Sequence, residues 1–592
     1  MHRLRRLPNP LALLVAAGAT LAGCTAYLGT TPDDGPVSSG GGGPIAGVGG
    51  GVSGTGASPG VASGGGQGEP PECLGADTVS NKRLVRLSFN QVANSIGTLV
   101  DSVLGTKIVD DFELVDAQHR AFPPLQSPRE GNSFTDQSWS SVDQIAQAAG
   151  SYAVDHLGDL TQCGAQPTDD CVLNYLTDLA EKAYRRPLGT EELNRFTTLY
   201  TDAFKGAGAS TTEALQYGVY AIFQAPQFLY RTEFGLDAHS AGPLTGLELA
   251  SMLSYFLTDD TPDELLMEGA AQGQLATDEQ VSAQVTRILG TAAAKKNLEG
   301  AMISYFAYPN LESQIIQDDA FTGDMRRSMY REAELFLQRA LWSDSLDSLL
   351  TSSKGYMDAT LAPIYGVTTF PPPGATPFIE AFYEVDLPQK RTGLLTQAGF
   401  LANRSRPDHT SVVGRGLLIK NAFLCTETPL PDEGIVGIIE QLLADKPDAT
   451  EREMAEIRAS ASSCSSCHES FDPYGLALDT YDVLGRYREV DDKGRPIDSS
   501  VTLPKVIGGG DASDIVEVAQ KLAASGAFGK CMGQNLVNYA LADVSAGAAS
   551  IDSCAVKRVA DAFKATDQTF PSLIKTVATS AAFSERLQGD AL

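Results

Sequence analysis

A pair of cysteines followed directly by a histidine has the most specific chemistry of any motif in this chain. The run Cys-Ser-Ser-Cys-His occupies residues 464–468. Haem carries two vinyl groups, each of which forms a thioether with one cysteine, and two intervening residues give the thiols that reach. We therefore expect Cys464 and Cys467 to bind one covalent haem c and His468 to bind its iron. We also expect Pro473 to orient the imidazole through its backbone carbonyl.

A redox disulfide and a zinc site are the alternative interpretations of this cysteine pair. A redox-active Cys-x-x-Cys normally opens a helix after a strand in an α/β context. Zinc needs four ligands, and no second Cys-x-x-Cys or histidine pair lies nearby in the sequence. The surroundings of the motif therefore favour haem. The chain has no Gly-x-Ser-x-Gly, phosphate loop or His-Glu-x-x-His, and we identify no catalytic residues.

The second axial position of the iron has two candidate ligands in the sequence, Met532 and His409. A Met or His there would leave the iron six-coordinate and suited to electron transfer, whereas an open position would permit ligand binding or peroxide chemistry. Met532 adjoins Cys531 on a helical run, so we favour core packing for its side chain. His409 lies in a polar stretch, 406–410. No local signature surrounds His119, His156 or His239.

The N-terminal residues indicate export and a lipid anchor. Basic residues at positions 3, 5 and 6 precede an apolar stretch over 11–21, which is shorter than the roughly 20 residues of a membrane-spanning helix. Small residues and then Cys24 follow, which resembles the bacterial lipobox, although an ordinary signal peptide with a chance cysteine is the alternative. Because Thr25 rather than Asp follows the cysteine, we expect anchoring to the outer membrane, on its periplasmic face or at the cell surface.

Cysteine usage also suggests an exported chain. Besides Cys24 and the motif pair, six of the nine cysteines remain, and an even remainder suggests disulfides. Spacing favours three pairs: Cys163 with Cys171 across a polar loop, Cys531 with Cys554 across a short connection, and Cys73 with Cys425 by elimination. Connectivity does not follow from spacing alone.

Composition and charge restrict the class of protein. With 592 residues, 43% of them hydrophobic, the chain can form three or four folded units. Its net charge of −29 repels phosphate backbones, so we expect no nucleic-acid partner. Within an expected linker over 24–72, the Gly/Ser/Pro-rich residues 33–71 bury little apolar area and predict a flexible tether of roughly 35 Å.

Apolar residues recur at helical spacing through most of the chain after residue 141, and alternating strand patterns are scarce. The stretches 170–184, 211–223, 247–257, 279–289, 325–341 and 573–583 show this period. We therefore predict an all-α or mainly α-helical, multidomain protein with few short strands.

Short motifs spread along the chain also resemble one family. In order, they are Ala183–Leu188, Pro226–Arg231, Leu253–Leu257 with Pro262-Asp263, Arg391–Thr396, Thr410–Gly416, Cys464–Arg488, and Cys531 with Asn538–Leu541. Together they resemble the planctomycete cytochrome-c-like exported proteins, which comprise domains of unknown function 1587, 1595, 1592, 1588 and 1585. The 1587-like motif, Arg86–Asn90, is faint. Thr258 stands where the family tends to have Trp, and Leu418 replaces another expected aromatic residue.

This resemblance implies a haem-bearing, helical, exported protein, but no agreed reaction. The expected parts are a lipoprotein signal peptide (1–23), the linker (24–72), a weakly 1587-like helical region (73–160), a 1595-like domain (161–235), a 1592-like domain (236–375), a 1588-like domain with the haem motif (376–490) and a 1585-like C-terminal domain (491–592).

Three functions fit these features. An electron carrier would dock a redox partner protein, and this is the function we favour. A haem peroxidase or oxidase would need an open distal position on the iron. A non-catalytic surface lipoprotein would instead bind a partner or a glycan.

Overall fold

A computed structural model describes the chain over residues 83–111, 136–164, 166–237, 240–388, 390–426, 428, 446, 448–461, 464–541 and 553–586. The predicted signal peptide, lipid-bearing Cys24 and the linker lie outside these residues, as do Cys73, His119 and His239.

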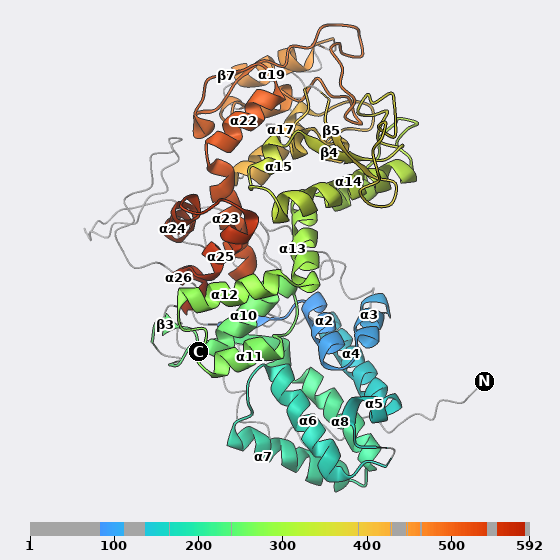
Figure 1. Ribbon diagram of the computed structural model, residues 1–592, viewed down its shortest axis with the longest axis vertical. Helices are drawn as coiled ribbons and strands as arrows, with labels where there is room; N and C mark the ends of the chain where they lie inside the picture. The colour runs from blue at the N-terminus through green and yellow to red at the C-terminus, as the bar shows by residue number, and fades with distance from the viewer. Residues whose placement is uncertain are drawn as a thin grey trace, which may run out of the picture. The chain divides into compact units, whose positions relative to one another are not determined.

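The described residues are mainly α-helical, as the sequence predicts (Figure 1). Many helices begin at a side chain that caps free backbone N–H groups. Ser88 with Gln91, Thr245 with Glu248 and Thr450 with Glu453 form reciprocal capping boxes, in which each partner accepts a hydrogen bond from the other's backbone N–H. The local sequence therefore sets these starting points without help from tertiary contacts.

The helices fall in three stretches of the chain. The first contains α2 (Phe89–Leu99), α3 (Ser102–Asp111), α4 (Asp136–Asp155), α5 (Leu157–Thr161), α6 (Asp169–Tyr184), α7 (Thr190–Thr198), the π-helix η2 (Leu199–Lys205), α8 (Thr211–Gln224) and α9 (Pro226–Leu229). The second contains α10 (Gly246–Thr258), α11 (Glu264–Ala271), α12 (Asp278–Leu289), α13 (Ala292–Tyr305), η3 (Tyr308–Glu312), α14 (Gly323–Trp342), α15 (Ser348–Thr351), η4 (Leu394–Thr396), α16 (Ala398–Ala402) and α17 (Val412–Leu424). The third contains α19 (Glu451–Ser460), α20 (Ser465–His468), α21 (Asp472–Leu476), η5 (Lys505–Ile507), α22 (Ile515–Ala524), α23 (Ala527–Leu541), α24 (Ser553–Lys564), α25 (Phe570–Ala578) and α26 (Ala581–Ser584).

Strands in the described part are short and form two-stranded antiparallel pairs. The pairs are β1 (Arg83–Arg86) with β2 (Tyr230–Glu233), β3 (Gly242–Pro243) with β8 (Glu585–Arg586), β4 (Lys354–Met357) with β5 (Tyr383–Asp386), and β6 (Val501–Thr502) with β7 (Asp511–Ala512). Two of these pairs, β1 with β2 and β3 with β8, join distant parts of the sequence and therefore tie segments together rather than build a sheet.

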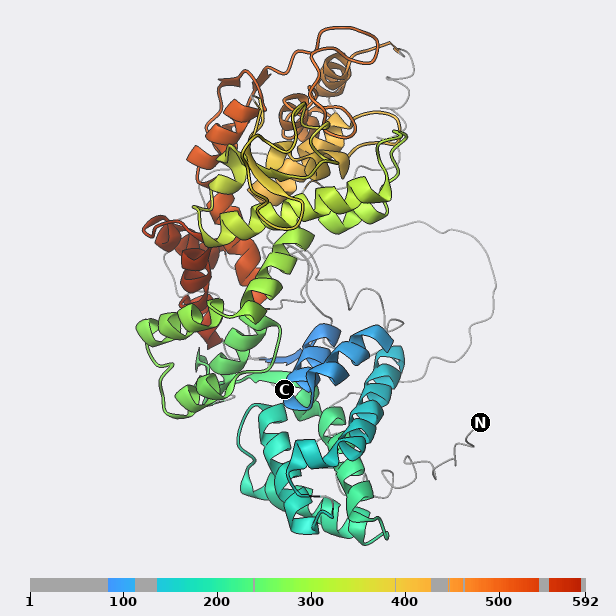
Figure 2. The same cartoon turned by 45° about the vertical axis from the view of Figure 1, so that its right-hand side comes forward.

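One hydrophobic core runs from Leu244 to Phe583. It joins the 1592-, 1588- and 1585-like segments, because α23 and α25 pack against α10 and α12 (Figures 1 and 2). The expected boundaries at 375/376 and 490/491 fall inside this shared core. Leu418, which replaces an expected aromatic residue, is one of its buried members.

Several arginines of the predicted motifs are buried and donate to backbone carbonyl groups. Arg185 donates to the carbonyls of Ala183, Gln227, Phe228 and Tyr230 at 2.8–3.1 Å. These hydrogen bonds attach the segment where α9 continues into β2 to the C-terminal end of α6. This motif residue therefore has a structural role.

The disulfides confirm one predicted pair and correct the other two. Cys163 and Cys171 are bonded as expected. The predictions of Cys531 with Cys554 and of Cys73 with Cys425 are wrong, because Cys425 is bonded to Cys531 over a separation of 106 residues. Cys425 ends α17 and Cys531 lies on the side of α23 that packs against α17, where its Cα is 5.1 Å from that of Cys425. Cys554 is also disulfide-bonded, but not to Cys531.

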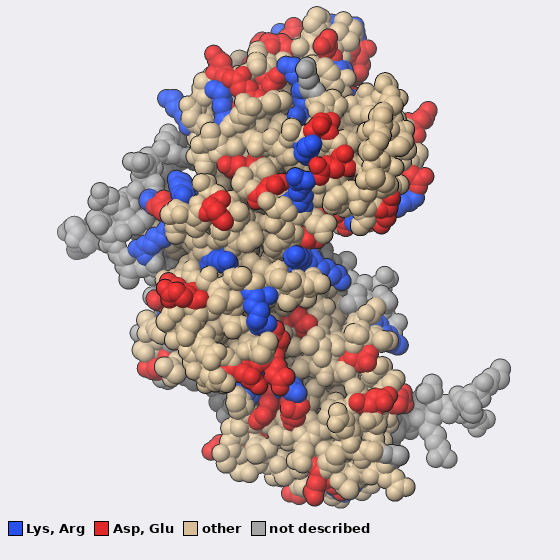
Figure 3. Space-filling model, in the orientation of Figure 1, with Lys and Arg blue, Asp and Glu red and all other residues tan. Residues whose placement is uncertain are grey.

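Acidic and basic side chains are interspersed on the face of the molecule drawn in Figure 3. None of the helices in the described ranges is both long and apolar enough to cross a membrane.

A buried ion pair holds the C-terminal end of the described chain. Arg586 Nε donates to Glu233 Oε2 at 2.7 Å, and both side chains are 0% exposed. Without Arg586, the buried Glu233 carboxylate loses its hydrogen-bonded cation, and the guanidinium of Arg231 lies further away, at 3.6 Å. We expect Arg586→Met to lower the free energy of unfolding by about 3–5 kcal/mol in equilibrium urea unfolding.

The matched control is Arg195→Met, because Arg195 pairs with Glu191 at 3.2 Å on the surface of α7. We expect Arg195→Met to lower the free energy of unfolding by less than about 0.5 kcal/mol. Equal losses from the two substitutions would contradict a stabilising role for the buried pair.

Candidate haem-attachment site

The Cys-x-x-Cys-His motif lies in a region built from α17, α19, α20 and α21. Helix α19 leads toward it, residues 462–463 are outside the described ranges, and Cys464 directly precedes the single turn of α20. The backbone N–H groups of Cys467 and His468 both donate to the Cys464 carbonyl, at 3.2 and 3.0 Å. One helical turn therefore holds both sulfurs and the imidazole in a fixed local order.

Burial differs among the three motif side chains. Cys464 is 2% exposed, Cys467 is half-buried, and the side chain of His468 is 12% exposed. Neither cysteine forms a disulfide. In the described part of the chain, no group of three or more His, Cys, Asp and Glu side chains is placed to bind a metal ion. That finding gives no support to the zinc interpretation.

The imidazole of His468 is held by a carboxylate. Its Nδ1 lies 3.2 Å from both carboxylate oxygens of Asp472, one helical turn further along the chain. A proton on Nδ1 leaves the lone pair on Nε2, which has no hydrogen-bond partner among the described residues. The prediction that the Pro473 carbonyl orients the ring is wrong, because Nδ1 pairs with the Asp472 carboxylate and the Pro473 carbonyl accepts from Ala477 N at 3.1 Å. A carboxylate on Nδ1 fixes the tautomer and raises the basicity of Nε2.

Asp472 is in turn held by Arg458. Arg458 Nε donates to Asp472 Oδ2 at 3.0 Å, and both side chains are 6% exposed. The guanidinium approaches the carboxylate from α19, while the imidazole approaches it from α20. Arg458, Asp472 and His468 therefore form a buried chain of charge-assisted hydrogen bonds, in which the ring orientation depends on two other elements.

Two glycines allow α17 and α21 to cross closely. A Cβ atom added to Gly416 on α17 would overlap the Phe471 carbonyl, and one added to Gly475 on α21 would overlap the Val412 carbonyl. Both glycines belong to the predicted family motifs. This contact places α21, and with it Asp472, against α17.

Arg415 fixes the chain that follows α21. Its guanidinium is buried and donates to the carbonyls of Leu478, Tyr481 and Asp482 at 2.6–3.1 Å. Burial lowers the pKa of this guanidinium to about 10. Arg391 reaches the same region with a hydrogen bond to the Gly485 carbonyl at 2.6 Å.

Near the motif, Glu451 is the carboxyl group whose pKa is shifted furthest from its usual value. Desolvation, followed by the nearby carboxylate of Asp479, raises its pKa to about 7, while Arg458 and His409 act in the opposite direction. Glu451 and Arg458 are seven residues apart on α19 and so face the same side of that helix. Helix α19 therefore holds a carboxyl group whose pKa lies well above that of an exposed glutamate.

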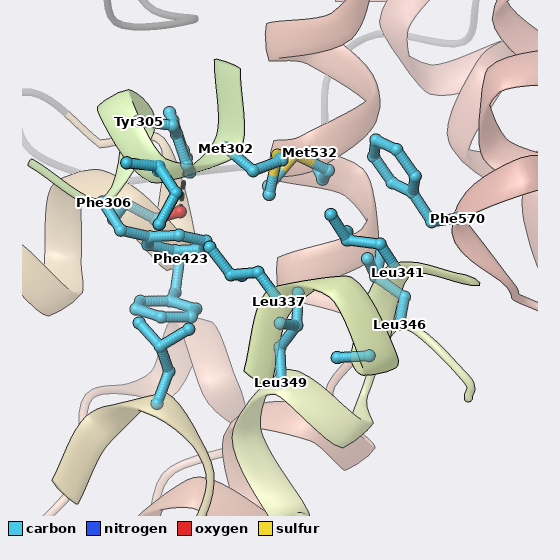
Figure 4. Packing of buried hydrophobic residues seen from close by; sticks show 14 of the residues in the cluster. Met302, Tyr305, Phe306, Leu337, Leu341, Leu346, Leu349, Phe423, Met532 and Phe570 are labelled. Carbon is cyan, nitrogen blue, oxygen red and sulfur yellow. Dashed lines mark hydrogen bonds between the residues drawn. The ribbon is translucent and has the colours of Figure 1, made fainter. Parts of the chain in front are cut away.

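The two predicted distal ligands lie in different environments. Met532 is 0% exposed and packs in the core with Met302, Leu341 and Phe570 around it (Figure 4). The His409 side chain is 58% exposed and its Nδ1 lies 2.7 Å from Asp408 Oδ1. No hydrogen bond or ring contact joins either residue to His468 among the described residues.

Sequence reasoning missed Asp472 as the partner of His468 and Arg458 as the partner of Asp472. The spacing of four residues from His468 to Asp472 is a helical contact spacing and could have indicated the first of them. Nothing in the sequence indicates Arg458, because its contact depends on how α19 packs against α21.

The helix crossing gives a prediction about stability. We expect Gly475→Ala to lower the free energy of unfolding by about 1–3 kcal/mol or more, because the added methyl group must displace the α17 backbone. Gly158→Ala in α5 is the control, since a Cβ there meets nothing within 4 Å. Urea unfolding monitored by circular dichroism should show a lower free energy of unfolding for Gly475→Ala only. Equal stability of the two variants would argue against a close crossing of α17 and α21.

Glu451 gives a prediction about pH. Its pKa in the folded chain, about 7, lies above the unfolded value, so the folded state binds this proton more tightly. Stability should therefore fall as pH rises from about 4.5 to about 7. Glu451→Gln should melt at a higher temperature than the wild type at pH 8 and at the same temperature at pH 4.

Glu453→Gln on the same helix is the control, because backbone and side-chain hydrogen bonds from Thr450 lower the pKa of Glu453. That variant should be no more stable than the wild type at pH 8. A Glu451→Gln effect that does not change with pH would contradict the assigned pKa shift.

Comparison with known families identifies four segments. Residues 171–233 match a family model described as a protein of unknown function (DUF1595), 244–367 match DUF1592, 391–491 match DUF1588 and 508–583 match DUF1585. The DUF1588 match contains the Cys464–His468 motif. No curated protein and no solved structure matches the chain. The expected 1587-like segment stays a prediction. The four matched families are the planctomycete cytochrome-like domain set, in the order that the sequence motifs predict.

Proposed function

We propose that this chain is an exported, lipid-anchored protein that carries one covalent haem c and transfers single electrons. The observation that carries this proposal is the state of His468, whose Nδ1 is held by a buried carboxylate while Nε2 has no hydrogen-bond partner among the described residues. Two cysteines lie in the same helical turn. The match to a cytochrome-like set of domains supports the same proposal.

Each residue of the site has a defined part in this proposal. Cys464 and Cys467 form the thioethers, His468 provides Nε2 to the iron, Asp472 holds the ring and Arg458 holds Asp472. When bound, the haem supplies a one-electron iron couple. The Asp472 carboxylate makes the imidazole a stronger electron-pair donor to the iron. This favours the oxidised iron and lowers the reduction potential of the haem.

Electron transfer also needs a partner and a location. A single haem exchanges electrons only with another cofactor, so we expect a redox partner protein that docks near the motif. The tether over 24–72 and acylation of Cys24 would hold the folded part near the outer membrane while it meets this partner. Cys24→Ala should then release the protein from membranes.

A haem peroxidase or oxidase is the second candidate function. It is favoured by one observation: both candidate distal ligands have other surroundings, since Met532 is buried in the core and His409 lies beside the Asp408 carboxylate. An iron without a sixth protein ligand binds small ligands and is high-spin. The visible spectrum therefore separates the two functions. A narrow low-spin α-band supports the carrier, and a high-spin spectrum that changes with cyanide supports the enzyme.

The effect of Asp472 on the iron gives a direct prediction. Asp472→Asn replaces the carboxylate that pairs with Nδ1 by a neutral amide of the same shape. The imidazole then donates its Nε2 electron pair less strongly to the iron. We expect the midpoint potential of the haem to rise by on the order of 60 mV, which is a tenfold change for a one-electron couple. Redox titration monitored by the visible spectrum measures this change.

The control is Asp492→Asn, which removes an exposed carboxylate that pairs with Arg488 at 2.7 Å. It should leave the potential within experimental error. A potential that is the same in the Asp472→Asn variant and the wild type would contradict the role assigned to Asp472, and a spectrum without haem would contradict the proposed function itself.

A further inference from the structure

Glu332 on α14 is a fully buried carboxyl group without an ion-pair partner among the described residues. The residue is 0% exposed, and the ion pairs of α14 are made by other side chains of this helix. Its Oε1 accepts a hydrogen bond from the Tyr365 hydroxyl, and its Oε2 has no hydrogen-bond partner. An ionised carboxylate offers about four acceptor positions, and this site fills one of them. Because a buried charge is costly unless it is paired and hydrogen-bonded, the site favours the neutral acid.

The charged and titratable groups that face Glu332 do not compensate a negative charge. Arg391 is the one cation of the described chain that acts on it, but its guanidinium lies 4.2 Å from the centroid of the Tyr365 ring and donates to three backbone carbonyl groups. Asp358 adds a second negative charge, and the Tyr308 hydroxyl donates to a glutamine side chain instead. Burial is the largest cause and raises the pKa of Glu332 to about 8, although Tyr365 and Arg391 act in the opposite direction.

Tyr365 connects this carboxyl group to helix α16. Its hydroxyl, which donates to Glu332, accepts a hydrogen bond from the N–H of Ala398, the first residue of α16, at 3.0 Å. The two helices also pack closely, since a Cβ atom added to Gly399 on α16 would lie 3.2 Å from Met329 Cβ on α14. Glu332 and Tyr365 belong to the segment that matches DUF1592, whereas α16 belongs to the segment that matches DUF1588. The carboxyl group therefore lies in the contact between these two segments.

We propose that Glu332 is a proton-controlled switch for the contact between α14 and α16. As the neutral acid, Glu332 accepts the hydrogen bond from Tyr365 and the contact stays closed. As the pH rises, the carboxyl group releases its proton to solvent, and the carboxylate is stable only where water supplies the missing hydrogen bonds. The ionised group therefore favours an open state in which α16 separates from α14. Opening loosens the segment that matches DUF1588, which contains the Cys464–His468 motif.

The direction of the pH effect follows from the two states of Glu332. Its pKa in the closed contact, about 8, lies above the value of a solvated glutamate, so the closed state binds the proton more tightly. The stability that Glu332 gives to the contact is therefore fully present below about pH 4.5. It is lost progressively as the pH rises to about 8, and this group has no further effect above that value.

Proteolysis of the full chain measures the opening. Arg391 and Thr392 are 6% and 3% exposed, so an arginine-specific protease cuts the bond between them only when the contact opens. Where opening and closing are fast, the rate of cleavage follows the population of the open state. We expect this rate, corrected with an unstructured peptide that contains the same bond, to rise by on the order of tenfold or more between pH 6 and pH 8.

Glu332→Gln keeps the shape and the neutral charge of the protonated group, so its corrected rate of cleavage should be nearly the same at both pH values. Glu334→Gln on the same helix is the matched control, because Glu334 pairs with Arg331 at 3.0 Å and its side chain is 40% exposed. This control variant should show the wild-type rise. A wild-type rate that does not change with pH, or an equal rise in Glu332→Gln, would overturn the inference.

Tyr365→Phe keeps the test decisive if Glu332→Gln does not fold. Tyr365 donates to the ionised form and so lowers the pKa of Glu332, whereas phenylalanine has no hydroxyl to donate. The rise in cleavage should then continue to a higher pH than in the wild type, and a rise that ends at the same pH would also overturn the inference. None of these groups belongs to the haem motif, so neither result bears on the proposed function.

Discussion

The close crossing of α17 over α21 is the contact on which the rest of the site depends. Because Gly416 and Gly475 have no side chains, the two backbones approach each other closely. Helix α21 carries Asp472 to His468, and α17 carries Lys420, whose Nζ donates to Ser470 Oγ beside the motif. A methyl group at either glycine would separate these groups. The chemistry of the motif is therefore set by a packing constraint several residues away from it.

Buried guanidinium groups complete this framework. Arg185, Arg391 and Arg415 each bind several carbonyl groups of chain segments that are irregular and would otherwise leave acceptors unsatisfied. These arginines lie in the motifs by which the chain resembles its family. The arginines of these motifs thus stabilise the scaffold. The candidate site consists of Cys464, Cys467, His468 and Asp472. The same division explains why four matched families of unknown function reveal architecture without specifying a reaction.

The sequence predicts the local features of this molecule well. Helical periodicity and the short loop between Cys163 and Cys171 act over a few residues, and both predictions are confirmed. Predictions that depend on distant packing are wrong or absent. The bond between Cys425 and Cys531 requires α17 to lie on α23, which no spacing reveals. The contact of Arg458 with Asp472 also depends on helix packing, so the sequence shows the motif but not the charges around it.

The central claim is that a porphyrin is bonded to this polypeptide at residues 464–468. The most direct measurement is mass spectrometry of the proteolytic fragment that contains Cys464 and Cys467, taken from protein exported by a host that attaches haem c. We expect a fragment whose mass exceeds that of the bare peptide by one haem and from which acid does not extract the pigment. A fragment with the mass of the bare peptide, with both thiols open to alkylation, would contradict it.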